Sequence, residues 1–155
     1  MPFQVVGKTR HFASVTTSLA LLIARIGLGI VFIAHGWQKY DEIGVKGVGG
    51  GFAKMGVPAP GLAAYFSTFV ELVDGAALLI GAFTAVAGVL LALDMLGALL
   101  FMHIDKGVFV TEGGYELVVA LGVGAFLLAV FGAGRYSVDG LLGRKVGRAG
   151  ALARS

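Results

Sequence analysis

Residues 17–38 read TSLALLIARIGLGIVFIAHGWQ, an apolar run in which Arg25 is the only Asp, Glu, Lys or Arg. A helix needs about 20 such residues to cross a bilayer. Three further runs of this kind follow at about 61–81, 84–104 and 115–132. Over the whole chain 57% of residues are hydrophobic and 14% are charged, whereas soluble domains average about 45–50% and about 25%. We therefore predict an all-α integral membrane protein, a four-transmembrane-helix bundle.

Four spans and short connections nearly exhaust the 155 residues, so we expect a single membrane domain, 1–155. The connection 39–60 is predicted to be an external loop, flexible or partly re-entrant. Its run GVGGG is not a nucleotide-binding loop, because no strand precedes it and no Walker lysine–hydroxyl pair follows. The basic C-terminal tail, 135–155, is either a short helix on anionic lipid or an irregular segment.

The distribution of basic residues predicts how the chain sits in the membrane. In the predicted topology, seven lysines and arginines lie on the side of the termini and four on the other side. Because cytoplasmic loops are enriched in these residues, both termini are predicted to be cytoplasmic. The chain has no cysteine, which excludes a thiolate metal site and thiol redox chemistry of its own. Its few charges give no support to nucleic-acid binding.

Four charged residues fall near the middle of the predicted spans: Arg25, Glu71, Asp74 and Asp94. Each costs at least about 2.5–3.5 kcal/mol in hydrocarbon, so each needs a partner. We expect Arg25 to pair with Glu71, Asp74 or both. One arginine cannot neutralise three carboxylates, so at least one carboxyl is expected to hold a proton. The cluster is interpreted either as a structural network that fixes helix register or as a group that handles protons.

The same arginine belongs to a stripe of small residues. Arg25, Gly29, Phe32 and Gly36 follow helical spacing, so they share one face of the first span. Glycines on such a face let another helix approach closely. Gly75 offers a similar gap on the second span, next to the two carboxyls.

A second polar group is predicted at the external ends of the spans, formed by His35, His103, Tyr115 and Glu116. Imidazole, phenol and carboxylate groups beside an apolar mouth suit hydrogen bonding to a quinone and exchange of its protons. Interfacial anchoring of helix ends is the alternative. Haem ligation by the two histidines and a metal site that adds Glu116 lack any supporting motif. We predict no metal and no intrinsic cofactor.

Four short motifs resemble the DoxX family of membrane proteins. They are LIARIGLG at 22–29 followed by HGWQK at 35–39, VELVDG at 70–75, GGYE at 113–116 and GAGRYSVD at 132–139. The resemblance implies a small four-helix protein of the bacterial inner membrane, related to the membrane subunit of a thiosulfate:quinone oxidoreductase. Members are often regarded as parts of redox or stress-defence assemblies. Asp74 departs from the small or neutral residue expected in many relatives.

The resulting functional hypothesis is a membrane subunit or anchor of an oxidoreductase assembly that interacts with quinone and is not catalytic alone. Its expected partners are membrane lipid, other protein subunits or soluble redox enzymes, and further copies of the chain. The alternatives are a noncatalytic scaffold or assembly protein and, with less support, a small transporter or channel.

Overall fold

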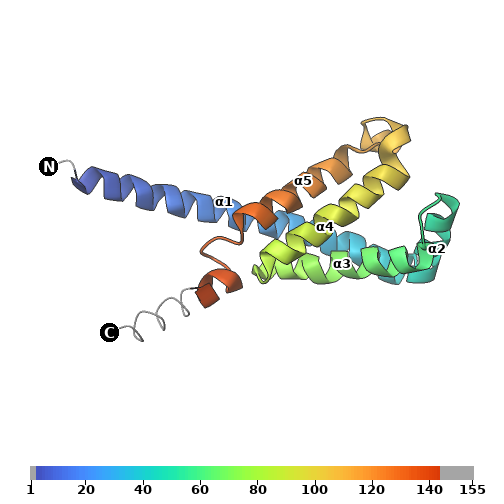
Figure 1. Ribbon diagram of the computed structural model, residues 1–155, viewed down its shortest axis with the longest axis horizontal. Coiled ribbons are helices and arrows are strands. Elements are labelled where there is room, and N and C mark those ends of the chain that lie inside the picture. Colours follow the sequence, from blue (N-terminus) through green and yellow to red (C-terminus); the bar gives the residue numbers. More distant parts are fainter. Residues whose placement is uncertain (1–2, 144–155) are drawn as a thin grey trace.

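The computed structural model describes residues 3–143, with side chains from residue 14 onward. Five α-helices account for most of this part (Figure 1). They are α1 (Phe3–Trp37), α2 (Val45–Lys54), α3 (Pro60–Ile80), α4 (Thr84–Ala98) and α5 (Glu116–Phe131). Two π-helical segments extend α1 and α4, namely η1 (Gln38–Glu42) and η2 (Leu99–His103). No strand occurs in the described residues.

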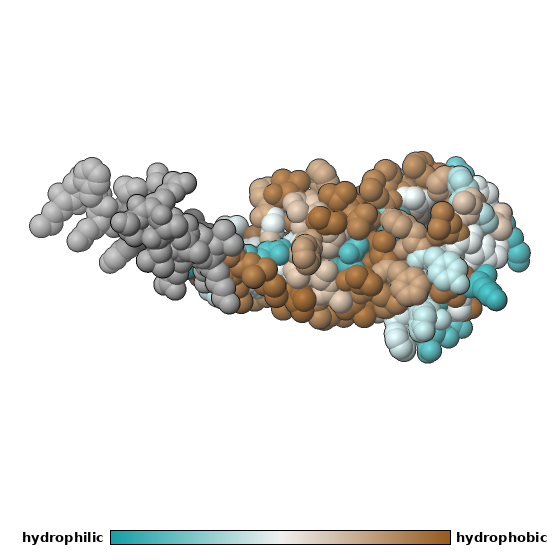
Figure 2. Space-filling model, turned by 60° about the horizontal axis from the view of Figure 1, so that its bottom comes forward, coloured by the Kyte–Doolittle hydropathy of each residue, from teal (hydrophilic) through white to brown (hydrophobic). Residues whose placement is uncertain are grey.

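The helices confirm the predicted all-α membrane fold. Three are long and apolar enough to cross a bilayer, over Ser14–Glu42, Pro60–Ile80 and Thr84–Lys106, and α5 is a shorter apolar helix of 16 residues. On the face seen in Figure 2, apolar residues cover the middle of the molecule and polar residues gather at one end. That end carries α2 and the connection between α4 and α5, while the turn between α3 and α4 lies at the opposite end (Figure 1).

Glycines bring α1 and α3 into close contact, as the stripe on the first span predicted. A Cβ atom built on Gly29 would lie 2.8 Å from the carbonyl oxygen of Gly75, and one on Gly36 would lie 2.9 Å from the backbone nitrogen of Leu72. A Cβ on Gly75 would lie 3.1 Å from the Cβ of Phe32, whose side chain is fully buried. Larger residues at these positions would force the two backbones apart.

The main core lies where α1, α3, α4 and α5 meet. Its buried apolar side chains are Phe32, Leu78, Ala87, Leu91, Met95, Leu121, Ala125 and Leu128. The contact between α4 and α5 depends on Gly88, because a Cβ there would lie 2.6 Å from the carbonyl oxygen of Ala125. The core therefore includes all four long helices and excludes α2.

The predicted external loop contains a helix, α2, so the expectation of a loop throughout 39–60 is wrong for residues 45–54. Val48 and Phe52, four residues apart, lie on one face and pack against Ala64 of α3. The many glycines argued against a helix, since each costs about 1 kcal/mol relative to alanine. Packing of the apolar face on α3 outweighs that low propensity.

After α5 the chain turns back toward α1 and is helical again over residues 138–143. The remainder of the predicted basic tail, 144–155, lies outside the described residues, and its association with lipid stays a prediction.

Candidate functional site

The buried arginine of α1 binds backbone carbonyl groups at the end of α3. Arg25 is fully buried, and its Nη1 atom donates to the carbonyl oxygens of Leu78 at 3.2 Å and Leu79 at 3.4 Å. Its Nη2 atom donates to the carbonyl oxygen of Tyr136. The expected pairing of Arg25 with Glu71 or Asp74 is therefore wrong. The guanidinium instead meets the C-terminal end of a helix, where the helix dipole is negative.

The segment after α5 closes over this arginine. Asp139 accepts hydrogen bonds from the backbone N–H groups of Phe83 and Thr84, both at 2.9 Å, and so caps the start of α4. Burial by itself would raise the pKa of the Asp139 carboxyl, but these hydrogen bonds and the charge of Arg25 outweigh it and lower the pKa. We call Arg25, Asp139 and the carbonyl groups of α3 and Tyr136 the clasp.

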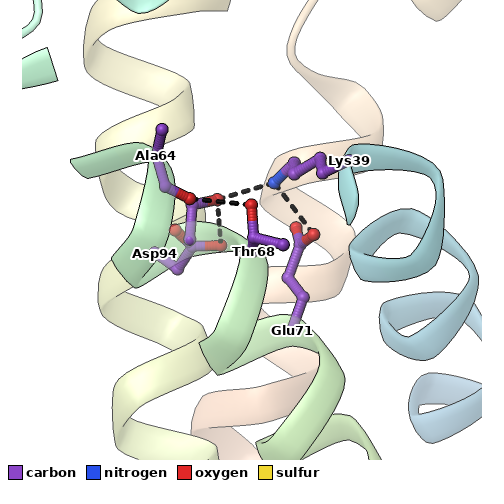
Figure 3. A network of polar contacts seen from close by, with 6 residues as sticks. Lys39, Ala64, Thr68, Glu71 and Asp94 are labelled. Atoms are coloured by element: carbon purple, nitrogen blue, oxygen red, sulfur yellow. Dashed lines mark hydrogen bonds and ion pairs between the residues drawn. The ribbon is translucent and has the colours of Figure 1, made fainter. Parts of the chain in front are cut away.

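A second polar network lies inside the bundle, toward the end that carries α2 (Figure 3). Lys39 of η1 extends its ammonium group between α3 and α4, where Nζ lies 2.8 Å from Oε2 of Glu71 and donates to Oγ of Ser67 at 2.6 Å. Ser67 in turn donates to Oδ2 of Asp94 at 3.3 Å. Thr68 is satisfied locally by the carbonyl oxygen of Ala64. The network thus joins three helical segments through one lysine and one serine.

The charges of this network do not balance. Lys39 supplies one positive charge, whereas Glu71 and Asp94 supply two negative charges when both are ionised. Both carboxylates are nearly inaccessible, with 2% and 9% of their residue surfaces exposed. The network therefore carries one excess negative charge unless it binds a proton or another cation.

The network borders a pocket of about 260 Å³. Lys39, Ser67 and Asp94 form its polar part, and the rest of the lining is apolar and comes from Phe52, Val57, Pro58, Ala63, Phe66, Leu93, Gly97, Ala98, Phe101 and Met102. Three of these apolar residues are well exposed, Phe66 at 44%, Leu93 at 54% and Phe101 at 43%. Because they belong to membrane-spanning segments, the pocket has a rim that faces lipid.

Both π-helical segments contribute to this site. Lys39 belongs to η1, and Phe101 and Met102 of the pocket lining belong to η2. A π-helical turn widens a helix locally and is frequent at functional sites. In α1 and α4 the change from α to π geometry occurs where the helix reaches the pocket.

The structure does not gather the four residues predicted at the external ends. His103 Nδ1 is 2.6 Å from the carbonyl oxygen of Gly113, and Glu116 accepts a hydrogen bond from the backbone N–H of Val110. Both therefore hold the connection between α4 and α5. Within residues 14–143 no hydrogen bond or ion pair links them to His35 or Tyr115, which are half-buried. That part of the chain also contains no group of three His, Asp or Glu side chains placed to hold a metal ion.

Asp74 is separate from both polar sites. It lies one helical turn beyond Glu71 on α3 and is half-buried. In the described part of the chain it makes no hydrogen bond or ion pair. Of the four charged residues predicted as one network, the structure joins only Glu71 and Asp94, through Lys39 and Ser67.

Neither Ser67 nor Lys39 was among the site residues predicted from the sequence. A usable signal existed for Ser67, because it lies four residues before Glu71 and so on the same face of α3. Lys39 follows a membrane span, and a lysine at such a position normally extends toward water. The π-helical turn that carries it inward has no recognisable sequence signal.

Comparison with known proteins places the chain among small membrane proteins. Residues 20–104 match the profile of a family described as DoxX. The membrane protein Rv3486 of Mycobacterium tuberculosis (strain ATCC 25618 / H37Rv) is 30% identical over 145 residues, covering 85% of this chain and 86% of that protein. The inner membrane protein YqjF of Escherichia coli (strain K12) is 33% identical over 128 residues, covering 82% and 95%.

A third relative has a name that points to redox chemistry. CatD of Bacillus subtilis (strain 168), named as a candidate oxidoreductase, is 29% identical over 103 residues, covering 66% of this chain and 73% of that protein. No solved structure matches the chain.

Proposed function

The chain belongs to the DoxX family of multi-pass membrane proteins, and we propose that it is the quinone-binding membrane component of a redox assembly. The observation that carries this proposal is the pocket between α2, α3 and α4, which combines apolar walls and a lipid-facing rim with a lysine, a serine and an aspartate. Small-molecule sites have this composition, a mostly apolar lining with a few polar groups that fix orientation.

The dimensions of the pocket fit one ring of a quinone. Pockets for drug-sized ligands measure about 300–1,000 Å³, and the 260 Å³ found here is just below that range. A quinone head group would occupy the pocket, and its isoprenoid tail would pass between Phe66 and Leu93 into the lipid. A water-soluble substrate would enter from the aqueous side, so a rim that faces lipid favours an apolar ligand.

The polar residues supply what a quinone ring needs for reversible reduction, which takes up two electrons and two protons. Lys39 would donate a hydrogen bond to a ring carbonyl oxygen and stabilise negative charge on it. Asp94, linked to the same place through Ser67, would hold and release a proton. The electrons come from a partner protein or a soluble donor, since the chain has no thiol to supply them.

The site proposed from the structure differs from the one proposed from the sequence. None of the four residues predicted at the external ends (His35, His103, Tyr115 and Glu116) lines the pocket of Lys39 and Asp94. We therefore assign quinone binding to the pocket and a local structural role to His103 and Glu116.

The test is quinone binding to the purified protein in lipid nanodiscs, with decylubiquinone as the probe and matched glycine variants. Gly97 lines the pocket, and a Cβ there would meet no atom within 4 Å, so the side chain of Gly97→Leu would begin in open space beside the pocket. Gly27→Leu is the control, because it is equally unobstructed and lies outside the pocket. We expect Gly97→Leu to weaken binding at least about tenfold and Gly27→Leu to leave it unchanged.

Conservative variants separate the two candidate sites. Lys39→Gln removes the charge of the donor that the proposal places against the ring oxygen, and we expect a tenfold loss of affinity or more, as about 1.5–3 kcal/mol per charged hydrogen bond implies. Glu116→Gln should bind the probe like the wild type. The opposite pattern would return the site to the external ends, and a wild-type protein that binds no quinone would refute the proposed function.

A second candidate function, a noncatalytic anchor, is favoured by Asp74. A half-buried carboxyl in the middle of a span, with no partner among the residues that the structure describes, is costly in lipid, and a helix of another subunit would satisfy it. Proteins that co-purify with the wild type and are lost with Asp74→Asn would support this role. An unchanged set of proteins would count against it.

We also propose that the protein resides in the bacterial inner membrane with both termini cytoplasmic. YqjF, named as an inner membrane protein, supports the location, and the excess of lysine and arginine on the side of the termini supports the orientation. Reporter fusions at Lys46 and at the chain end test it. We expect the first to report the exterior and the second the cytoplasm.

A further inference from the structure

Helix α2 has little intrinsic stability. Four of its ten residues are glycines, Gly47, Gly49, Gly50 and Gly51, and each costs about 0.8–1 kcal/mol relative to alanine in a helix. Isolated helices shorter than about 12–15 residues are marginal even in alanine-rich sequences. No side chain caps the N-terminus of α2. The helix therefore exists because it is docked on α3.

The docking contact is separate from the main core. Val48 and Phe52 pack against Ala64 in a cluster of their own, which shares no buried residue with the core of α1, α3, α4 and α5. Glycines in a left-handed conformation flank the helix, Gly44 at φ 74° and Gly56 at φ 75°. These two positions allow large backbone rotations, so α2 can leave α3 while the four long helices keep their packing.

Helix α2 borders the pocket, so its release from α3 would change the pocket wall. Phe52 of α2 and the residues after it, Val57 and Pro58, form part of the pocket wall. Figure 1 shows α2 at the far end of the bundle, beside the start of α3. Undocking of α2 would remove Phe52 from the wall. This change would widen the pocket around a head group that enters through the lipid-facing rim, and it would open the pocket to water at the end opposite the clasp.

We propose that α2 is a hinged lid, which opens about Gly44 and Gly56 and controls how fast a quinone exchanges with the pocket and how much water reaches Lys39 and Asp94. This inference rests on the proposed function for its ligand. The structural part, opening of α2 while α3 stays folded, does not depend on the ligand. A lid that opens in this way typically limits binding and release rather than affinity.

An engineered disulfide between α2 and α3 would hold the lid closed. The natural chain contains no cysteine, so two introduced cysteines have no other partner in the chain. A Cβ on Gly49 would lie 3.7 Å from the Cβ of Ala64, and disulfides bridge Cβ atoms about 3.5–4.5 Å apart. The oxidised and reduced forms of the double variant Gly49→Cys/Ala64→Cys are therefore compared in nanodiscs. The matched control is Gly49→Cys alone, which cannot form the bridge.

The first measurement is the rate of decylubiquinone binding and release. We expect oxidation to slow both rates at least about tenfold and reduction to restore them, while the control variant responds to neither treatment. Equal rates in the oxidised and reduced protein, with binding intact, would overturn the lid and leave the proposed function standing. Failure of the wild type and the reduced variant to bind quinone would overturn the proposed function and, with it, control of quinone exchange by α2.

The second measurement needs no ligand. Hydrogen–deuterium exchange of wild-type amides should be at least about a hundredfold faster in α2 than in the middle of α3, and the disulfide should slow the exchange of α2. Protection of α2 equal to that of α3 would refute the opening motion itself, whatever the quinone data show.

Discussion

The contacts of Arg25 make a quantitative prediction for the variant Arg25→Met, which keeps the length of the side chain and removes its charge and donors. Three hydrogen bonds to carbonyl oxygens are lost. At the membrane-protein average of about 0.6 kcal/mol each, they sum to about 2 kcal/mol. At about 1.5 kcal/mol, the lower end for charged donors, they sum to about 4–5 kcal/mol. We expect the free energy of unfolding to fall by about 2–5 kcal/mol.

The assay is reversible unfolding in mixed detergent–SDS micelles, followed by circular dichroism. Double-mutant cycles give the decisive comparison. Because Arg25 contacts the end of α3 and not Glu71, the effects of Arg25→Met and Glu71→Gln should add to within about 0.5 kcal/mol. The effects of Arg25→Met and Asp139→Asn on the free energy of unfolding should not be additive, since the two charges interact across the clasp. Coupling between Arg25 and Glu71, without coupling to Asp139, would refute the clasp.

Three further predictions test other parts of the structure. Asp139→Asn should cost about 1 kcal/mol through the weakened cap of α4. The pKa of Asp139 in the folded protein lies below its ordinary 3.8, so the stabilisation by its carboxylate is complete above that pH and is lost as the pH falls through the folded value. Wild type and variant should therefore converge in melting temperature once the pH is below the pKa of the folded protein. Asp74→Asn should raise the free energy of unfolding by about 1 kcal/mol, since it removes from the span a charge that has no partner in the described part of the chain; a loss of stability would show that the carboxyl has a partner. Gly75→Leu should cost about 3 kcal/mol or more by separating α1 from α3, whereas Gly27→Leu should change the melting temperature little.

The membrane fold was predictable because it depends on properties that a local stretch of sequence contains. The length of each apolar run fixes whether it can span, and the spacing of Gly29 and Gly36 marks the face of α1 that another helix approaches. Helix α2 escaped prediction because its formation depends on a surface of α3 that sequence alone does not place. The glycine content of 47–51 correctly indicates weak helix propensity, and packing of Phe52 and Val48 reverses the outcome.

The candidate site was less predictable, because counting charges does not reveal their partners. The sequence contains an arginine and three carboxyls at similar depth, and pairing them assumes that a buried cation must meet an anion. Arg25 instead donates hydrogen bonds to backbone carbonyl oxygens, including those at the end of α3. A pattern of side chains in the sequence cannot reveal such backbone partners. The cation that does meet Glu71 is Lys39, whose direction depends on the π-helical turn after α1.

The two polar sites of α3 differ in a way that separates structure from function. At the clasp, both terminal nitrogens of Arg25 and both carboxylate oxygens of Asp139 bind backbone groups. These hydrogen bonds hold the segment that follows α5 against α1 and against the turn between α3 and α4. Around Lys39, by contrast, one ammonium group serves two carboxyls beside an open pocket, Glu71 directly and Asp94 through Ser67. A purely structural ion pair gains nothing from an excess buried charge, because that charge costs stability unless something neutralises it. An arrangement that binds or releases a proton as a ligand arrives uses the excess charge directly, and this difference is why we place the function at Lys39 and Asp94 and the structural role at Arg25.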